Sequence, residues 1–298
     1  MKLPRIALAA AASFLFAASL SATSAHTWVS ANGNDSTGTG TTAKPYASFN
    51  TAVSNTTAGG IVSVLGPGDY GAVTITQSIT IDATGGGSIV FAGGEGIYID
   101  AGSNANIVLR NLTVDGGAVG SDAIFIASSG TTNIVNVLID NCHIEGFSQI
   151  GVGLGSESPM YVTIRNSAIQ GGTLGVRTFQ NSSSTPVDHV TIDHSSIQGA
   201  ASIGVFTRNG NVDILNSSIS GSVGGALPTA GIMADTNATL NVQSTMITSN
   251  TNGVCIYSGS TATLATTTTV ADNATNVQPC GGTVQGASGA GPTPKTKL

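Results

Sequence analysis

The feature that most constrains this chain is a short motif that returns at intervals of 22 to 30 residues along most of its length. Its clearest copies are "VTIRNSAIQGG" from Val162 and "VTIDHSSIQGA" from Val190. Related segments begin at residues 79, 107, 137, 212, 240 and 262. Periods of this length indicate stacked supersecondary units rather than an ordinary globular domain, because each unit buries its apolar face only against its neighbours.

Each repeat unit has the pattern of two short strands joined by a sharp turn. Its first three residues alternate between core and solvent, which is the two-residue period of a strand. A turn residue follows, and asparagine is favoured there because it tolerates a left-handed backbone. The turn residues are Asn111, Asn141, Asn166, His194 and Asn216. Short strands that turn in the same sense and stack about 4.8 Å apart form a parallel β-helix.

The repeat resembles that of right-handed parallel β-helix proteins of the pectate-lyase-like superfamily. The segment "WVSANGNDSTGTGTTAKPYASFNTAV" and the later "GGIVSVLGPGDYG" are similar to the entry segment of its secreted members. This resemblance covers about residues 27 to 280 and implies an all-β, single-stranded right-handed parallel β-helix. The superfamily includes lyases, hydrolases, esterases and adhesins, so the fold does not define the function.

The two ends of the chain differ from the repeat region. Residues 1–25 have the basic start, the apolar run and the small final residues of a secretory signal peptide, with cleavage expected after Ala25. The protein is therefore expected to be secreted, either to the periplasm or outside the cell, with no integral membrane segment after processing. Residues 61–282 are predicted to form the β-helix, and residues 283–298 a flexible tail.

Residues 26–60 are predicted to form an N-terminal cap with a strand and a short helix. Tyr46, Phe49 and Val53 fall on one helical face, and Pro45 suits a first helical turn. An amphipathic helix here would cover the apolar end and the unpaired strand edge of the first coil.

Composition excludes some partners and compartments. The formal net charge of −6 provides no basic surface for a nucleic acid. Three cysteines are too few for a disulfide framework and lack the close spacing of a zinc site. Cys255 and Cys280 are separated by about one repeat of the motif, so we expect them to be stacked neighbours close enough for a disulfide. Cys142 is expected to stay free.

In a β-helix, equivalent positions of successive coils form columns along one face. One outward column alternates in charge, and opposite charges in neighbouring coils attract by about 0.2–1 kcal/mol per pair. We interpret it as a structural charge ladder that keeps the coils in register. The lining of a substrate groove is the alternative interpretation. The charge ladder consists of Asp82, Arg110, Asp140, Arg165 and Asp193.

A second outward face gathers aromatic and arginine side chains, although only 5% of the residues are aromatic. The assignment assumes that in each strand one apolar residue points inward and the next residue points outward, so that Met233 and Cys255 also face outward. The residues assumed to point inward are Ile97, Ile124, Val152, Val176, Val205, Ile232 and Val254. Rings and guanidinium groups suit sugar faces and acidic groups. A covering loop, the tail or a second subunit is the alternative explanation. The candidate ligand-binding residues, which we call the strip, are Tyr98, Phe125, Arg177, Phe179, Phe206, Arg208 and Asp235.

The sequence assigns no catalytic residue. A lyase needs a base, yet Lys44 is the one lysine between the leader and the tail. Asp188, His189, Asp193 and His194 lie in one segment but match no glycosidase motif, and no acidic calcium cluster is visible. No metal and no cofactor are predicted. These observations favour a non-catalytic exported protein that binds polysaccharide or serves as a surface or matrix element. The alternative function is a polysaccharide lyase or glycoside hydrolase acting on an acidic glycan, and the oligomeric state stays open.

Overall fold

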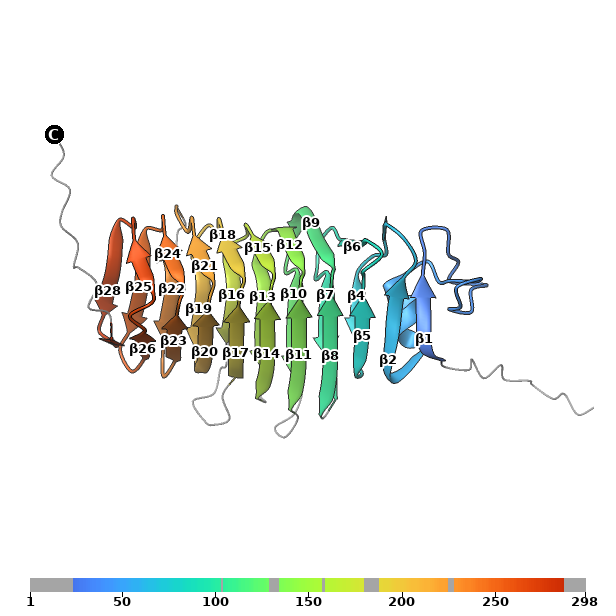
Figure 1. Ribbon diagram of the computed structural model, residues 1–298, viewed down its shortest axis with the longest axis horizontal. Helices are drawn as coiled ribbons and strands as arrows, with labels where there is room; N and C mark the ends of the chain where they lie inside the picture. Colours follow the sequence, from blue (N-terminus) through green and yellow to red (C-terminus); the bar gives the residue numbers. More distant parts are fainter. Residues whose placement is uncertain are drawn as a thin grey trace, which may run out of the picture.

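The computed structural model describes residues 24–102, 104–128, 134–156, 159–179, 188–224 and 228–286. They form an elongated stack of coils that runs along one axis from the N-terminal to the C-terminal strands (Figure 1). Each complete coil contributes one strand to each of three sheets, and neighbouring strands within a sheet run parallel. The predicted all-β, single-stranded parallel β-helix is therefore confirmed, with one short helix among the described residues.

The first sheet has 11 strands and extends over the whole length of the stack. In order, they are β1 (Ser24–Val29), β2 (Thr56–Val64), β5 (Ile79–Asp82), β8 (Ala105–Arg110), β11 (Val135–Asp140), β14 (Met160–Arg165), β17 (Asp188–Asp193), β20 (Gly210–Leu215), β23 (Thr239–Gln243), β26 (Thr261–Leu264) and β29 (Thr283–Gln285).

The second and third sheets have nine strands each. The second contains β3 (Gly68–Asp69), β6 (Gly87–Val90), β9 (Thr113–Gly120), β12 (His143–Phe147), β15 (Ala168–Gln170), β18 (Ser196–Gln198), β21 (Ser218–Ser220), β24 (Met246–Thr248) and β27 (Thr269–Ala271). The third contains β4 (Val73–Ile75), β7 (Ile97–Asp100), β10 (Ile124–Ser128), β13 (Ile150–Ser156), β16 (Leu174–Phe179), β19 (Ile203–Arg208), β22 (Ala230–Asp235), β25 (Asn252–Tyr257) and β28 (Thr275–Cys280).

The turn from the first to the second sheet is made at the predicted asparagine column. Its residues have φ between 47° and 60°, a left-handed conformation that asparagine adopts at less cost than most side chains. The next apolar position then points inward, and its stacked side chains form part of one continuous core that runs through the coils. These residues are Val114, Ile144, Ile169, Ile197, Ile219 and Ile247, all at most 1% exposed.

Glycine is required where several coils enter the third sheet. A Cβ atom at these positions would lie 2.5–2.9 Å from a carbonyl oxygen of the next coil, closer than a side chain can approach. The column therefore sets how tightly the coils stack beside the strip. It consists of Gly151, Gly175, Gly204, Gly231 and Gly253.

The N-terminal helix is shorter than the apolar pattern suggested. Helix α1 (Phe49–Ser54) begins after Ser48, whose hydroxyl accepts a hydrogen bond from the Thr51 amide at 3.2 Å. Phe49 and Val53 are buried as expected. Tyr46 is not helical, because its amide donates to Trp28 O and holds this segment extended along β1.

The boundaries of the β-helix also differ from the expected ones. Strand β1 and the first half of β2 belong to the first sheet although residues 26–60 were expected to form a separate cap, and β1 begins at Ser24, within the expected leader. Strand β29 lies beyond residue 282. Residues 40–46 run along β1, where the Trp28 amide donates to Gly40 O, and so cover the edge of this strand. The expected leader, up to residue 23, and residues 287–298 of the expected tail lie outside the described residues.

Candidate functional site

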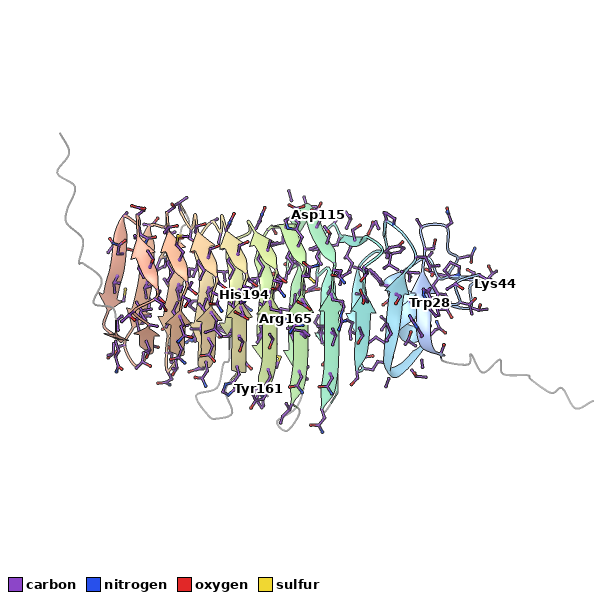
Figure 2. All side chains as sticks on the ribbon, viewed as in Figure 1. Trp28, Lys44, Asp115, Tyr161, Arg165 and His194 are labelled. Atoms are coloured by element: carbon purple, nitrogen blue, oxygen red, sulfur yellow. The ribbon has the colours of Figure 1, made fainter. Side chains whose placement is uncertain are left out.

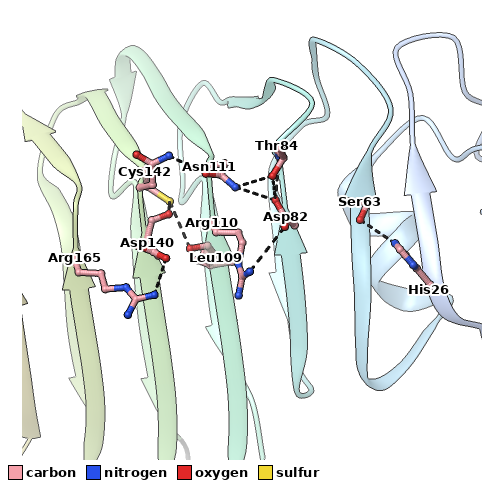
Figure 3. A network of polar contacts seen from close by, with 11 residues as sticks. His26, Ser63, Asp82, Thr84, Leu109, Arg110, Asn111, Asp140, Cys142 and Arg165 are labelled. Atoms are coloured by element: carbon pink, nitrogen blue, oxygen red, sulfur yellow. Dashed lines mark hydrogen bonds and ion pairs between the residues drawn. The ribbon is translucent and has the colours of Figure 1, made fainter.

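The five residues of the charge ladder lie opposite one another in β5, β8, β11, β14 and β17. Arg110 Nη1 lies 4.0 Å from Asp82 Oδ2. Arg165 Nη2 lies 2.9 Å from Asp140 Oδ2. Figure 3 shows both pairs, in which each arginine reaches the acid of the preceding coil. The column therefore links neighbouring coils through side chains as well as through the backbone.

The turn asparagines, which sequence reasoning treated only as backbone turns, also bond the acids of the charge ladder. Three of these side-chain amides donate to a carboxylate of the preceding coil, and Asn141 donates to Asn111, so the turn column and the charge ladder form one polar network. The sequence indicated that the two columns are adjacent, because each turn residue directly follows the outward position of its strand. The bonds are Asn111 Nδ2 to Asp82 Oδ1 (2.9 Å), Asn166 Nδ2 to Asp140 Oδ1 (3.1 Å) and Asn216 Nδ2 to Asp193 Oδ1 (3.0 Å).

These contacts favour the ionised form of the ladder acids. The hydrogen bond from Arg165 is the main reason why the pKa of Asp140 lies below its usual range. The Asn216 amide has the same effect on the pKa of Asp193. Burial acts against ionisation of Asp82, but hydrogen bonds from its neighbours outweigh it, so the pKa of Asp82 is lowered as well. Because these pKa values are lowered on folding, the ionised carboxylates stabilise the fold at neutral pH.

A hollow of about 860 Å³ follows the turn between the first and second sheets. It is lined by the turn asparagines, His194 and small hydroxyl-bearing residues. Arg165 and His194 lie near this bend, whereas Tyr161 lies at the opposite end of its strand (Figure 2). His194 Nδ1 lies 2.8 Å from Asp193 Oδ1, and Asn141 Nδ2 donates to the neighbouring asparagine at 2.8 Å. The polar groups of this hollow therefore bond mainly to one another, which indicates a structural role.

The strip lies on the outer face of the third sheet. All seven residues that were expected to point inward are fully buried in the main core, so the predicted facing of these strands is correct. Tyr98, Phe125, Arg177 and Phe206 occupy one column, and each is partly exposed. Phe179, Arg208 and Asp235 occupy the column two residues further along the strands.

The C-terminal end of the first strip column was expected to be open to solvent, but it is buried. Met233 and Cys255 are only 3% and 2% exposed, and they form a second small apolar cluster with Ile203 and Ala230. The cluster lies outside the main core, on the other side of the third sheet. The sequence did not predict this cluster. Ile203 and Ala230 stand at the first positions of their strands, before the alternation of inward and outward residues from which the facing was predicted.

The aromatic rings of the strip contact other members of the strip. The Tyr98 and Phe125 rings stack with centroids 6.2 Å apart, and the Phe125 ring extends over the glycines of β13. The Phe179 ring receives two guanidinium groups, with Arg177 Cζ 5.3 Å and Arg208 Cζ 5.2 Å from its centroid. Such cation–π contacts hold both arginines against the sheet while part of each side chain stays exposed.

Acids accompany both arginines of the strip. Arg208 Nε lies 3.8 Å from Asp235 Oδ2. Burial lowers the pKa of Arg177, and the nearby Asp122 carboxylate opposes that change. Asp122 is 8% exposed, and burial raises its pKa although Arg177 acts in the opposite direction. Glu95 adds a further acid beside Asp122. The face is therefore not a positively charged surface.

Two further hollows lie at the ends of the strip. The N-terminal one, of about 390 Å³, is lined by polar groups including Asn50, Glu95 and Tyr98. Asn50 comes from helix α1, a contact that no local sequence pattern could reveal. The C-terminal one, of about 260 Å³, is lined mainly by apolar side chains of the second cluster, with Asp235 at its edge.

All three cysteine thiols are free in the structure, and Cys142 and Cys255 are buried. In the register of β25 and β28, Cys280 lies opposite Tyr257 and Cys255 lies opposite Gln278. The two cysteines are therefore diagonal rather than direct register partners, and their side chains still contact each other. Burial raises the pKa of Cys255 to about 12 and that of Cys142 to about 11, so both stay protonated.

The segment that carries two acids and two histidines does not converge on one site. Asp188 is fully buried and accepts a hydrogen bond from the Met160 amide at 3.1 Å. His189 points outward and stacks on Tyr161, with ring centroids 4.9 Å apart. Within the described residues, no group of three or more histidine, cysteine or acidic side chains could hold a metal ion. In the same part of the chain, no helix is long and apolar enough to cross a membrane.

Comparison with known proteins agrees with this architecture. Residues 95–291 match the family described as right handed beta helix region, and the chain belongs to this family. A crystal structure of the pectate lyase Pel9A is similar, with a TM-score of 0.61 and 14% identity over 88% of this chain and 76% of that one. The GH136 lacto-N-biosidase from Eubacterium ramulus has a TM-score of 0.50 and 10% identity over 88% of this chain and 67% of the enzyme. No curated protein matches the sequence.

Proposed function

We propose that this protein is an exported, non-catalytic polysaccharide-binding β-helix and that the strip is its binding surface. The observation that carries the proposal is the register of the strip. Aromatic or guanidinium groups recur on the third sheet from β7 to β19, and each is partly exposed. Export is motivated by the leader-like residues 1–25.

The spacing of the strip suits a chain of sugar rings. Successive coils lie about 4.8 Å apart, a distance comparable to the size of one pyranose ring. A glycan laid along the axis would therefore meet an aromatic edge or a guanidinium group at most of its units. Its hydroxyl groups could accept hydrogen bonds from Arg177 and Arg208, which the Phe179 ring holds in place.

The charges of the strip favour a neutral glycan over an acidic one. Arg208 is paired with Asp235, and Arg177 lies beside Asp122. Glu95 adds a carboxylate at the N-terminal end. A polyanion would meet these acids as well as the arginines and would gain little net attraction. Two structurally similar proteins are, by name, a pectate lyase and a lacto-N-biosidase, which supports a carbohydrate ligand in general.

The proposal is tested by retention of the mature protein on a panel of neutral and acidic polysaccharides, followed by calorimetry with the polysaccharide retained most strongly. We expect a neutral polysaccharide to be retained and pectate and alginate to be retained weakly. Arg177→Ala should weaken binding about tenfold to a hundredfold, because a hydrogen bond to a charged group contributes about 1.5–3 kcal/mol. Arg165→Ala is the matched control, since it removes an arginine from the ladder face instead.

Two outcomes would contradict this function. If no polysaccharide of the panel is retained by folded protein, the strip is not a glycan site. If new reducing ends or unsaturated products accumulate during incubation, the protein is catalytic, and the lyase or hydrolase alternative takes precedence. Circular dichroism of each variant establishes that a loss of binding does not come from unfolding.

A further inference from the structure

We propose that the hollow at the C-terminal end of the strip binds an acetyl substituent of a sugar in the bound glycan. This inference rests on the proposed polysaccharide-binding function and adds a preference for substituted chains. Its basis is the second apolar cluster, which is separate from the core of the β-helix and lies against an open hollow of about 260 Å³.

The walls of the hollow come from several coils of the third sheet. Leu174 and Ile203 are register partners in β16 and β19, and Phe206 and Met233 are partners in β19 and β22. Tyr257 of β25 completes the wall. Because Ile203 and Met233 are nearly buried while Leu174, Phe206 and Tyr257 are only partly buried, the floor is closed and the rim is open.

The size of the hollow limits its occupant to a small group. Pockets that hold drug-sized ligands have volumes of about 300–1,000 Å³, and one water molecule takes about 30 Å³ of the liquid. A space of about 260 Å³ is therefore small for a helix or a long acyl chain but large enough for a substituent and part of its sugar ring. Continuity with the strip through Phe206, which belongs to both, places this occupant on the same glycan.

The polar groups at the rim suit a carbonyl-bearing substituent. Asp235 and Tyr257 are the two polar side chains that line an otherwise apolar space, and Asp235 Oδ2 lies 3.8 Å from Arg208 Nε, so its charge is partly balanced. Burial, together with the nearby Cys255, Cys280 and Asp235, raises the pKa of Tyr257. The phenol of Tyr257 lines the hollow and can donate a hydrogen bond to a carbonyl oxygen, whereas the apolar wall accepts the methyl group.

Among the described residues, the N-terminal half of the strip has a different surface from the C-terminal end. There the ring of Phe125 extends over Gly153 and Gly155 and fills the surface of β13. The hollow beyond Tyr98 has a mixed wall, because Asn50, Thr74 and Glu95 line it together with Ala72 and Val73. A preference for a substituent should therefore arise at the C-terminal end alone.

The test uses the polysaccharide of the panel that is retained, as alkali-deacetylated chains and as chains chemically acetylated to a low degree. Wild-type protein should bind the acetylated form about three- to tenfold more tightly, because one buried methyl group corresponds to roughly a fourfold gain. Leu174→Phe should fill the hollow and remove this preference without weakening binding of the deacetylated form. Val119→Phe, at a position 64% exposed on β9, is the control for an added ring and should keep the preference.

Each outcome separates this inference from the function on which it rests. Equal affinity of wild-type protein for both forms overturns the substituent site and leaves polysaccharide binding in place. Absence of binding to any form overturns both. If the wild-type protein is a dimer that Leu174→Phe dissociates, the hollow is a subunit contact and the inference is wrong.

Discussion

The outer faces of the first and third sheets come from the same coils but use their polar side chains differently. On the first sheet, Arg165 and Asn166 both bond Asp140 of the preceding coil, so charge and amide are satisfied within the stack. On the third sheet, Arg177 and Arg208 rest on the Phe179 ring, and their acidic neighbours lie at longer range. The side chains of the first face therefore hold the coils together. On the second face, the guanidinium groups of Arg177 and Arg208 make no ion pair with a described acid that is as short as the pair between Arg165 and Asp140.

The two faces also differ in what lies beside them. The hollow next to the charge ladder is lined by amides and hydroxyls that bond one another. The hollow at the C-terminal end of the strip has an apolar wall that nothing in the described chain fills. A polar hollow closed by its own hydrogen bonds gains little from a ligand, while an apolar one gains from each methyl group placed in it. This contrast supports a structural role for the first face and is the basis for proposing a binding role for the other.

The largest effect on stability is expected at the turn that joins the ladder to the bend. Asn166→Ala forces a residue with a Cβ and no side-chain amide to keep φ near 52° and removes the bond to Asp140. The free energy of unfolding should fall by about 1–2 kcal/mol, measured by urea denaturation. Asn166→Gly keeps the backbone freedom, so its smaller loss reports the amide bond alone. Equal losses in the two variants would show that backbone strain plays no part.

Removal of one carboxylate charge should change the free energy of unfolding by a smaller amount. The sign of the change should differ between Asp140 of the ladder and Asp122 beside the strip. The pKa of Asp140 is lowered by folding, so its ionised form stabilises the fold above the ordinary pKa of about 4, and this contribution is lost as the pH falls below it. The pKa of Asp122 is raised by burial, so ionisation there reduces stability as the pH rises. Asp140→Asn should therefore destabilise the protein at neutral pH, whereas Asp122→Asn should stabilise it.

Urea denaturation at several pH values measures both variants. The Asp122→Asn side chain keeps an oxygen that can accept the hydrogen bond from the Ile150 amide, so packing changes little. Both differences from wild type should vanish at acidic pH, where the wild-type carboxyls are protonated as well. A destabilised Asp122→Asn variant at neutral pH would mean that the attraction between Asp122 and Arg177 exceeds the cost of burying the charge.

How much the sequence predicts depends on whether a feature follows from one repeat or from several coils together. The stacked core around Ile169 and the turn at Asn166 follow from the two-residue period and from asparagine's tolerance of positive φ. The burial of Met233 does not, because it depends on Ile203 and Ala230 in neighbouring coils. The exact register of the cysteines does not follow either, since the last coil is shorter than the interval between Cys255 and Cys280, which makes the two residues diagonal partners.

The start of the helix and the contacts within the strip also depend on residues distant in sequence, so the local pattern did not predict them. Pro45 suits a first helical turn, but a hydrogen bond from Tyr46 to Trp28 keeps this segment extended, and only Ser48 provides the cap. The sequence indicated which aromatic residues share a face, yet it could not show that Phe179 contacts two arginines, because one of them comes from the next coil.

The smallest change in the free energy of unfolding is expected from reversing one charge of the ladder. Arg165→Asp places a carboxylate between Asp140 and Asp193, which are its direct partners in β11 and β17. Because the Arg165 side chain is 47% exposed, the loss of stability should be modest and should depend on salt. Arg165→Gln removes the attraction without adding repulsion, so the gap between the two variants isolates the repulsion. That gap should narrow as NaCl is raised from about 0.05 M to about 1 M, where the Debye length falls to about 3 Å. A gap that salt does not change would indicate altered packing on this face, and the first sheet would then not be stabilised by the charges of its ladder, which is the property that separates it from the proposed binding face.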